Sequence, residues 1–252
     1  MGEKTEIAWT HHTFNCWRGC VKVSEGCANC YANAFSHRMG EDFWGKDKPR
    51  KFYGEKHWNE PLKWNRKAFE AGVMNRVFCG SMCDCMEDRP DLLNERKRLF
   101  TLIEKTNNLI WLLLTKRPEN FLKFLPQEWI KTPRENVWLM TTIENEKNMW
   151  RAKELAKVPA VVKGISMEPL LSEVSIKNVD PSITWFIVGG ESGPRMFDIA
   201  WARKIKKECE ERGNSFFMKQ MGSHPVGMKL ESYKGDDPEE WPKDIRVRDF
   251  PA

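Results

Sequence analysis

The sequence lacks any long hydrophobic run. Its 252 residues contain no apolar stretch approaching the roughly 20 residues that a membrane-spanning helix needs. The first residues, Met1 to Thr5, also lack the basic and then apolar layout of a secretory signal. We therefore expect a protein without a membrane anchor that resides in the cytoplasm. In that compartment thiols stay reduced, and clustered cysteines bind metal or do chemistry more often than they form disulfides.

Histidine is scarce as well, and neither basic nor acidic residues are in large excess. The five histidines show no metal-ligand spacing: His11, His12, His37, His57 and His224. Lysine and arginine total 41 against 36 acidic residues, a net charge of +5. Over this length such a charge is too mild to identify a nucleic-acid-binding protein. Composition alone therefore indicates neither a histidine-built metal centre nor a nucleic-acid partner.

Cysteine, by contrast, is concentrated in one short segment. Four of the eight cysteines lie in the cysteine loop, residues 15–31, with the spacing C-x3-C-x6-C-x2-C. Thiolates this close in sequence can converge on one soft metal ion or iron–sulfur centre, and the glycines between them permit tight turns. We interpret the loop as the candidate active centre. A structural zinc site and a disulfide framework are the alternatives.

A basic aromatic insert, residues 40–70, follows this loop. Between Lys46 and Lys67 it carries eight basic residues against three acidic ones. Its aromatic side chains, Phe43, Trp44, Phe52, Tyr53, Trp58 and Trp64, could stack on bases or on a ribose. The favoured interpretation is an irregular surface segment that its aromatic residues pin to the rest of the fold.

Strand and helix patterns then alternate along the chain. Strands are expected over residues 6–10, 76–80, 109–114, 137–141, 161–165, 185–189 and 215–219, and helices over 30–39, 91–105, 146–157 and 199–212, with a short helix opened by Pro118. The link 168–182 shows no long helix, and the polar tail, residues 222–252, is expected to form loops. This alternation predicts one α/β domain over residues 1–252 with a parallel sheet, either open or curled into a barrel.

Polar residues end each expected strand. Those singled out are Ser81, Asp84, Thr115, Lys116, Thr142, Glu144, Ser166, Glu168, Glu191 and Lys219. Because the carboxyl ends of parallel strands share one face of the sheet, we expect these residues and the cysteine loop to ring one mouth. This convergence favours an enzyme, since a structural zinc site does not require it.

The acidic members of this set need partners. Glu144, Glu168 and Glu191 would repel one another unless they bind cations, protonated amines or ribose hydroxyls. Lys116, Arg117 and Lys219 are expected nearby. A mixed ring of this kind suits a zwitterionic ligand that carries a nucleoside.

At this point the residues resemble a known family. The run from Gly19-Cys20 to Ser24, followed by Gly26-Cys27-x-x-Cys30-Tyr31-Ala32, is similar to the phage-associated three-cysteine-motif family, which looks like a divergent branch of the radical S-adenosylmethionine enzymes. The resemblance covers almost the whole chain. It continues through Gly80-Ser81-Met82-x-Asp84, Leu114-Thr115-Lys116-Arg117-Pro118, Ser166-Met167-Glu168-Pro169 and Val188-Gly189-Gly190-Glu191.

The resemblance implies a partial (β/α) barrel of the radical S-adenosylmethionine type with a [4Fe-4S] cluster on Cys20, Cys27 and Cys30. Three thiolates leave one iron open for S-adenosylmethionine, and reduction of that ligand by the cluster yields a 5′-deoxyadenosyl radical. The resemblance places Ser81, Asp84, Thr115, Thr142, Glu144 and Ser166 at the cofactor, and Glu168, Glu191 and Lys116 in catalysis. An external electron donor is implied. The substrate is not identified, and nucleic acid or a nucleotide is a candidate.

The remaining cysteines leave alternatives open. In the resembled pattern Cys16 is a bystander, whereas a rival hypothesis joins it to Cys20, Cys27 and Cys30 in a closed four-thiolate zinc site of a nucleic-acid-binding protein. A second group, Cys79, Cys83 and Cys85, would bind another metal or supply a thiol to a substrate radical. The favoured interpretation is that Cys79 is a small buried hydrophobe and the other two are incidental. Cys209 is expected to be structural.

Overall fold

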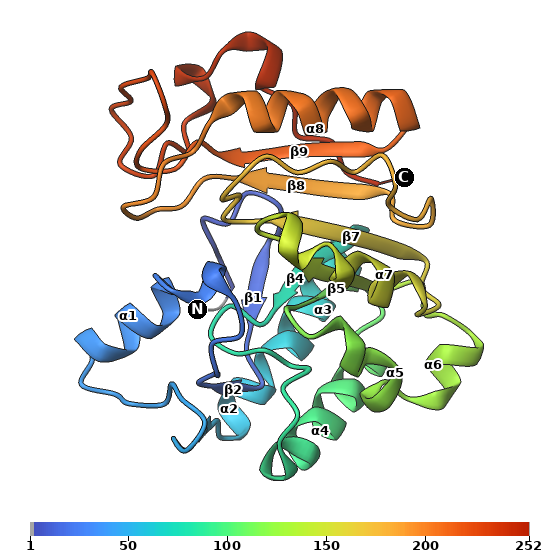
Figure 1. Cartoon of the computed structure of the whole chain (residues 1–252). Helices are drawn as coiled ribbons and strands as arrows, with labels where there is room; N and C mark the ends of the chain where they lie inside the picture. Colours follow the sequence, from blue (N-terminus) through green and yellow to red (C-terminus); the bar gives the residue numbers. More distant parts are fainter. Residues whose placement is uncertain (1–2, 252) are drawn as a thin grey trace. The chain divides into compact units, whose positions relative to one another are not determined.

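A computed structural model describes residues 3–251 as an α/β chain (Figure 1). Its residues divide into two compact units. The first unit comprises Met1–Leu139 and Val158–Val161, and the second Met140–Lys157 and Val162–Ala252. The main strands within each unit run parallel, so the expected α/β class with parallel strands is confirmed.

In the first unit, three strands lie side by side in the order β1 (His12–Phe14), β4 (Asn75–Cys79) and β5 (Leu109–Thr115). Phe14 pairs with Cys79, and Cys79 with Leu113. β5 is buried along most of its length, as its continuous apolar sequence predicts for a covered parallel strand. A further strand, β6 (Val137–Thr142), begins in this unit and ends in the second.

The prediction of a strand over residues 6–10 is wrong. That segment ends in a turn, in which the Thr10 amide donates to Ile7 O at 3.1 Å, and the first strand begins only at His12. Trp9 is buried against Phe78, with ring centroids 4.7 Å apart. The sequence pattern was misleading because the short apolar run Ile7-Ala8-Trp9 has the composition of a strand.

The first unit contains the helices expected over residues 30–39 and 91–105 and after Pro118, and three further helices that were not expected. They are α1 (Tyr31–Arg38), α2 (Glu55–Trp58), α3 (Glu60–Glu70), α4 (Leu93–Glu104), α5 (Phe121–Phe124) and α6 (Gln127–Lys131). The expectation of an irregular insert is wrong for residues 55–70, which are mostly helical. In α3, Pro61 stands at the start of the helix, and Pro61, Trp64 and Ala68 form a buried stripe at helical spacing.

The aromatic side chains of the insert anchor it, as the favoured interpretation predicts. Trp58 packs edge-on against Phe14 with ring centroids 5.2 Å apart, and Trp64 stacks on His12 at 4.6 Å. Both tryptophans are buried, so neither offers a face to a nucleic-acid base. The aromatic argument for nucleic-acid binding therefore does not apply to these two residues.

In the second unit, β7 (Val162–Met167), β8 (Trp185–Gly189) and β9 (Ser215–Gln220) are neighbours in that order. The helices are α7 (Trp150–Ala156) and α8 (Ile199–Arg212), and α8 lies alongside β8 and β9 (Figure 1). α8 has the bounds that its sequence predicts. Asp198 caps its start by accepting from the Ala200 amide, and Gly213, at φ 68°, ends it in the left-handed region.

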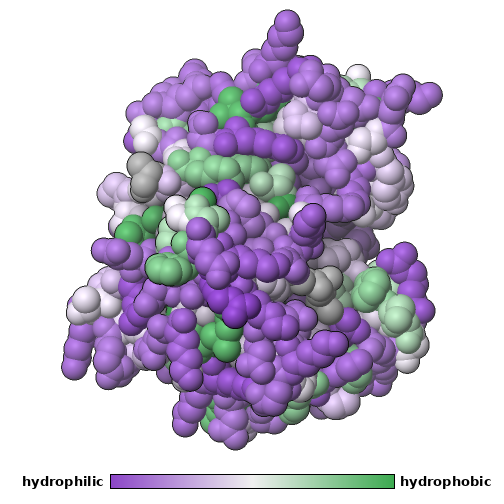
Figure 2. Space-filling model, turned by 180° about the vertical axis from the view of Figure 1, so that it is seen from behind, coloured by the Kyte–Doolittle hydropathy of each residue, from purple (hydrophilic) through white to green (hydrophobic). Residues whose placement is uncertain are grey.

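The remaining segments of the second unit are loops, as expected. Residues 168–182 contain no helix, and within 222–251 the structure shows only short 3-10 turns and isolated bridges. Across residues 3–251, none of the helices combines the length and apolar character that a membrane crossing requires. On the face shown in Figure 2, hydrophilic residues predominate and hydrophobic ones form small separate patches.

Candidate functional site

The cysteine loop presents three half-buried thiols. Cys20, Cys27 and Cys30 are partly exposed and form no disulfide. A 3-10 turn, Glu25–Cys27, carries Cys27, and Cys30 directly precedes α1. Within the described range 3–251, no set of three or more His, Cys, Asp or Glu side chains is already arranged to hold a metal ion. The donor set nevertheless fits an iron–sulfur cluster, because three accessible soft sulfur ligands lie on one loop rich in turns.

Cys16 lies apart from these three thiols. It is fully buried, and its sulfur lies 3.9 Å from the sulfur of Cys83. Burial and a hydrogen bond with Cys79 raise the pKa of Cys16 well above its usual value. The structure thus divides the four cysteines of the loop into three partly exposed thiols and one buried one.

The insert frames the cysteine loop. β2 (Trp17–Arg18) pairs antiparallel with β3 (Lys51–Phe52) of the insert, and the Gly45 amide donates to Cys20 O at 3.0 Å. Gly19 has φ 113°, a conformation that favours glycine, and a Cβ built on it would lie 2.4 Å from Phe43 O. The insert therefore fixes the backbone on which Cys20 sits.

Gly19→Ala is expected to destabilise the first unit. The added Cβ would clash with a backbone oxygen in a conformation that side chains rarely adopt, so the loss should exceed about 1 kcal/mol. Gly54→Ala is the matched control, because a Cβ at Gly54 meets no atom within 4 Å and its φ is not positive. Chemical denaturation of both variants checks this; an equal midpoint for the two would contradict it.

Arg50 connects the insert to the rest of the first unit. Its guanidinium is fully buried and forms a two-point ion pair with Glu87, at 2.6 and 3.1 Å. The same group donates to Phe43 O at 3.0 Å and to Lys48 O at 2.9 Å. One side chain therefore holds both the insert loop and the segment that follows β4.

Beside Cys20, Asp84 and Arg117 form a buried ion pair. Arg117 Nη1 lies 2.6 Å from Asp84 Oδ2 and 3.8 Å from the Cys20 sulfur. Arg117 Nη2 donates to Val21 O at 2.9 Å, and Thr115 Oγ1 donates to Asp84 Oδ1 at 2.6 Å. The sequence-predicted residues Asp84 and Thr115 are thus brought together, and Arg117 connects them to a cysteine of the loop.

The charges of this group set the state of Cys20. Burial raises the pKa of the Cys20 thiol, the carboxylate of Asp84 raises it further, and Arg117 lowers it. Burial lowers the pKa of Arg117, but Asp84 and Cys20 raise it more, so the guanidinium stays charged. Without a metal the balance favours a neutral thiol at Cys20, and Arg117 is the cation placed to stabilise its thiolate.

Ser81 also lies beside the cysteine loop. Its hydroxyl accepts from Asn15 Nδ2 at 3.0 Å, and its carbonyl accepts from the Tyr31 hydroxyl at 2.7 Å. Tyr31 directly follows Cys30. Lys116 is half-buried and donates its amide to Asp84 Oδ2 at 3.2 Å. The predicted residues Ser81, Asp84, Thr115 and Lys116 therefore share one region with the loop in the first unit.

In the second unit, predicted residues converge at the ends of β7, β8 and β9. Glu168 accepts from Ser166 Oγ at 3.0 Å and pairs with Lys219 Nζ at 2.7 Å. A Cβ at Gly189 would lie 3.2 Å from Glu168 Oε1, so glycine at this position lets the carboxylate approach the strand. This cluster matches the expectation that strand ends come together.

Glu144 and Glu191 have cations that the sequence did not indicate. Glu144 is fully buried, pairs with Arg151 at 2.8 Å and accepts from Asn148 at 2.9 Å. Arg151 also donates to the carbonyl of the predicted residue Thr142 at 2.9 Å. Glu191 pairs with Arg195, whose Nε lies 3.1 Å away. Each acid has a local cation partner, and only Lys219 for Glu168 belongs to the set named from sequence.

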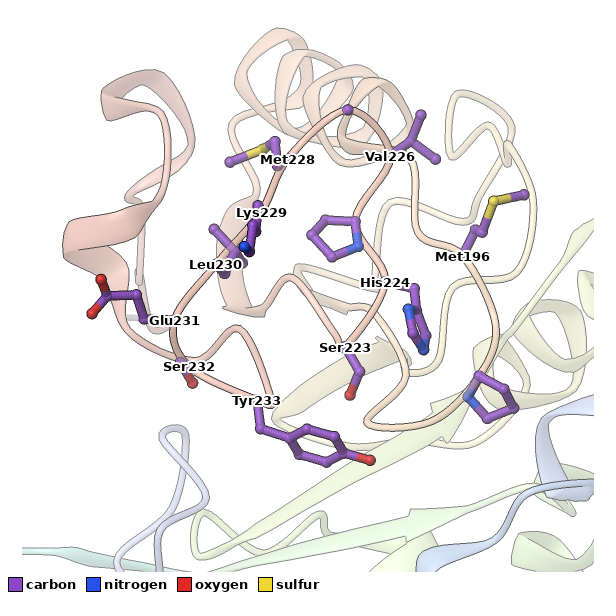
Figure 3. A pocket seen from close by; sticks show the side chains of 13 residues that line it. Met196, Ser223, His224, Val226, Met228, Lys229, Leu230, Glu231, Ser232 and Tyr233 are labelled. Carbon is purple, nitrogen blue, oxygen red and sulfur yellow. The ribbon is translucent and has the colours of Figure 1, made fainter.

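A hollow of about 720 Å³ lies elsewhere in the second unit, in loops that follow β8 and β9 (Figure 3). Met196, His224, Met228 and Tyr233 are among its lining residues. The described residues that line it include none of the predicted site residues. It gives no support to the predicted site.

Sequence reasoning missed Arg50, Arg151 and Arg195, and it named Arg117 as a cation near Glu144, Glu168 and Glu191 rather than as the partner of Asp84. The motif Lys116-Arg117-Pro118 at the end of β5 was a signal for Arg117. Arg50 lies in the insert, Arg151 on α7 and Arg195 in the loop after β8, all places where an arginine usually faces solvent. Only their contacts with Glu87, Glu144 and Glu191 in the folded chain reveal them.

Comparison with known families and proteins gives one result. No curated protein and no solved structure matches this chain. One family matches residues 4–240, nearly the whole chain, and its description is "Protein of unknown function (DUF5131)". Because this match spans nearly the whole chain, the chain belongs to this family, DUF5131.

Proposed function

We propose that this chain is a radical S-adenosylmethionine enzyme that resembles the phage-associated three-cysteine-motif family. Cys20, Cys27 and Cys30 would hold a [4Fe-4S] cluster. The observation that carries the proposal is the separation of Cys16 from the other three thiols. Cys16 is buried with its sulfur 3.9 Å from Cys83, which leaves three ligands rather than four for a metal centre on the loop.

A cluster held by these three thiols would supply the electron for reductive cleavage of S-adenosylmethionine to methionine and a 5′-deoxyadenosyl radical. The chain's own residues prepare the ligands. Arg117, 3.8 Å from the Cys20 sulfur, favours the thiolate that a metal requires. Asp84 orients Arg117, and Thr115 in turn orients Asp84.

The second unit would provide the groups that bind the cofactor or the substrate. Ser166, Glu168 and Lys219 form a hydrogen-bonded set of opposite charges, which suits a zwitterionic ligand. Glu144 and Glu191 keep their proposed places at the cofactor and in catalysis, with Arg151 and Arg195 balancing their charge. Nucleic acid or a nucleotide is the proposed substrate class, with an external electron donor and a cytoplasmic setting.

Anaerobic reconstitution of the purified chain with iron and sulfide tests this function. We expect a brown protein with broad absorption near ~400 nm from thiolate-to-iron charge transfer. With a chemical reductant it should convert S-adenosylmethionine to 5′-deoxyadenosine. A protein that retains one zinc per chain, unfolds on chelation and leaves S-adenosylmethionine intact would instead support the four-thiolate zinc hypothesis.

A further inference from the structure

A second group of thiols lies in the first unit, apart from the three of the loop. Cys16, Cys79 and Cys85 are fully buried, and Cys83 is half-buried. Cys79 ends β4, where it pairs with Phe14, two residues before Cys16. The parallel pairing of β1 with β4 is what brings these cysteines together from distant parts of the sequence.

Within this group, the sulfurs of Cys16 and Cys83 are 3.9 Å apart. A disulfide has an S–S distance of about 2.05 Å, so a small side-chain movement separates the two states. The backbone leaves room for the Cys83 sulfur, since a Cβ at Gly80 would lie 2.4 Å from it. Cys83 Sγ also donates to Asn15 Oδ1 at 3.7 Å, which keeps it directed toward the segment that carries Cys16.

The arrangement favours a pair over a metal site. The Cys16 sulfur lies 3.9 Å from that of Cys83, and Cys79 interacts with Cys16 on one side and with Cys85 on the other, so the thiols form a row. A metal needs ligands around one point, whereas these thiols follow one another in a row. Adjacent thiols in such a row can instead form a disulfide, and a neighbouring thiolate can then attack that disulfide.

A buried cation faces this row. Arg96 is almost fully buried, donates to Cys85 O at 2.9 Å and has no hydrogen-bond partner for Nη1 within the described part of the chain. Burial lowers the pKa of Arg96, and the nearby charges of Cys85 and Cys16 raise it. Arg96 therefore compensates for negative charge that forms on a thiolate of the row.

We propose that Cys16 and Cys83 form a reversible dithiol–disulfide site that reacts with a low-molecular-weight disulfide. Cys83 is the entry point because it is the partly exposed member of the pair. Its thiolate attacks one sulfur of the ligand, whose S–S bond breaks and releases one thiol. Cys16 then attacks the Cys83 sulfur and releases the second thiol, so the protein loses two electrons and two protons and the ligand gains them.

The site would act on the cysteine loop. Cys16 directly precedes β2, which leads to Cys20, and Cys83 directly precedes Asp84, which holds Arg117 beside Cys20. A Cys16–Cys83 bond would tie together the two segments that position Cys20. The disulfide itself does not depend on the proposed cluster, so the two proposals can fail separately.

The test uses the full chain without iron, reduced and then incubated anaerobically with glutathione disulfide. After an acid quench and alkylation, digestion with trypsin places Cys16 alone in the peptide of residues 5–18, and cleavage at methionine separates Cys79 from Cys83 at Met82. Fragmentation of the linked peptide then distinguishes Cys83 from Cys85 within residues 83–86. We expect a peptide that links Cys16 to Cys83 in mass spectra of the unreduced digest. The link should disappear in Cys16→Ser and Cys83→Ser and persist in Cys85→Ser and in the distant control Cys209→Ser.

The wild-type digest decides the question even if a variant fails to fold. A link that joins two cysteines of the loop, or full alkylation of Cys16 and Cys83 after the incubation, overturns the proposal. A link that persists in Cys83→Ser and joins Cys16 to Cys79 also overturns the assignment of the pair. Circular dichroism of each variant confirms that the comparison is made on folded protein.

Discussion

Cys27→Ala is expected to abolish retention of an iron–sulfur cluster after anaerobic reconstitution. Cys27 is one of three partly exposed thiols on the loop, and a cluster left with two protein ligands is lost to competing thiols and water. Iron and sulfide content should fall to background, and the absorption near ~400 nm should disappear. Cleavage of S-adenosylmethionine should cease with it.

Two cysteine variants provide the comparison. Cys209→Ala removes a buried thiol from α8 in the second unit, and Cys16→Ala removes the buried thiol of the loop. Both should retain iron and sulfide at the wild-type level. Equal metal content in Cys27→Ala and wild type would refute the cluster assignment, whereas loss of metal in Cys16→Ala as well would favour the four-thiolate zinc site.

Arg50→Met should produce the largest loss of stability, about 3–5 kcal/mol, because it leaves Glu87 as a buried charge without its partner. It also removes the donor from the carbonyls of Phe43 and Lys48. The insert loop would then release the backbone of Gly19 and Cys20. Chemical denaturation measures the stability, and proteolysis within residues 40–50 reports the release of the insert.

The matched control lies in the same loop. Lys48 pairs with Asp42 at 2.5 Å, but both side chains are about half exposed, so Lys48→Met should cost no more than about 1 kcal/mol. The double variant Arg50→Met/Glu87→Leu should recover part of the loss, since it removes both buried charges. If Arg50→Met were as stable as Lys48→Met, the bracing role of Arg50 would be wrong.

Much of the fold was predictable because the strands and helices have strong local patterns. The continuous apolar run of β5 and the capped, amphipathic α8 fall within a residue of their predicted bounds. β1 was misplaced because the apolar run Ile7-Ala8-Trp9 has the composition of a strand, although Trp9 packs in a turn against Phe78. α3 was missed because charged residues dominate its sequence and only three positions face the core.

The candidate site was predictable in its residue types but not in its pairing. Glu144, Glu168 and Asp84 were singled out from their places at strand ends, and all three are buried or half-buried with cations beside them. Glu144 pairs with Arg151, which lies seven residues later on α7, and this partner was not predicted. No local pattern distinguishes such an arginine from one that faces solvent.

The sequence by itself determined the α/β class, the order of the strands along the chain and the concentration of thiols in residues 15–31. These features depend on periodicity and spacing between near neighbours. Only the tertiary structure decided that Cys16 leaves the loop group for Cys83, that Arg117 reaches Cys20, and that Arg50 joins the insert to Glu87. Burial makes those pairings necessary, because an isolated charge or polar group in the interior costs free energy. Which partner each group finds depends on the tertiary fold, because the paired residues lie far apart in the sequence.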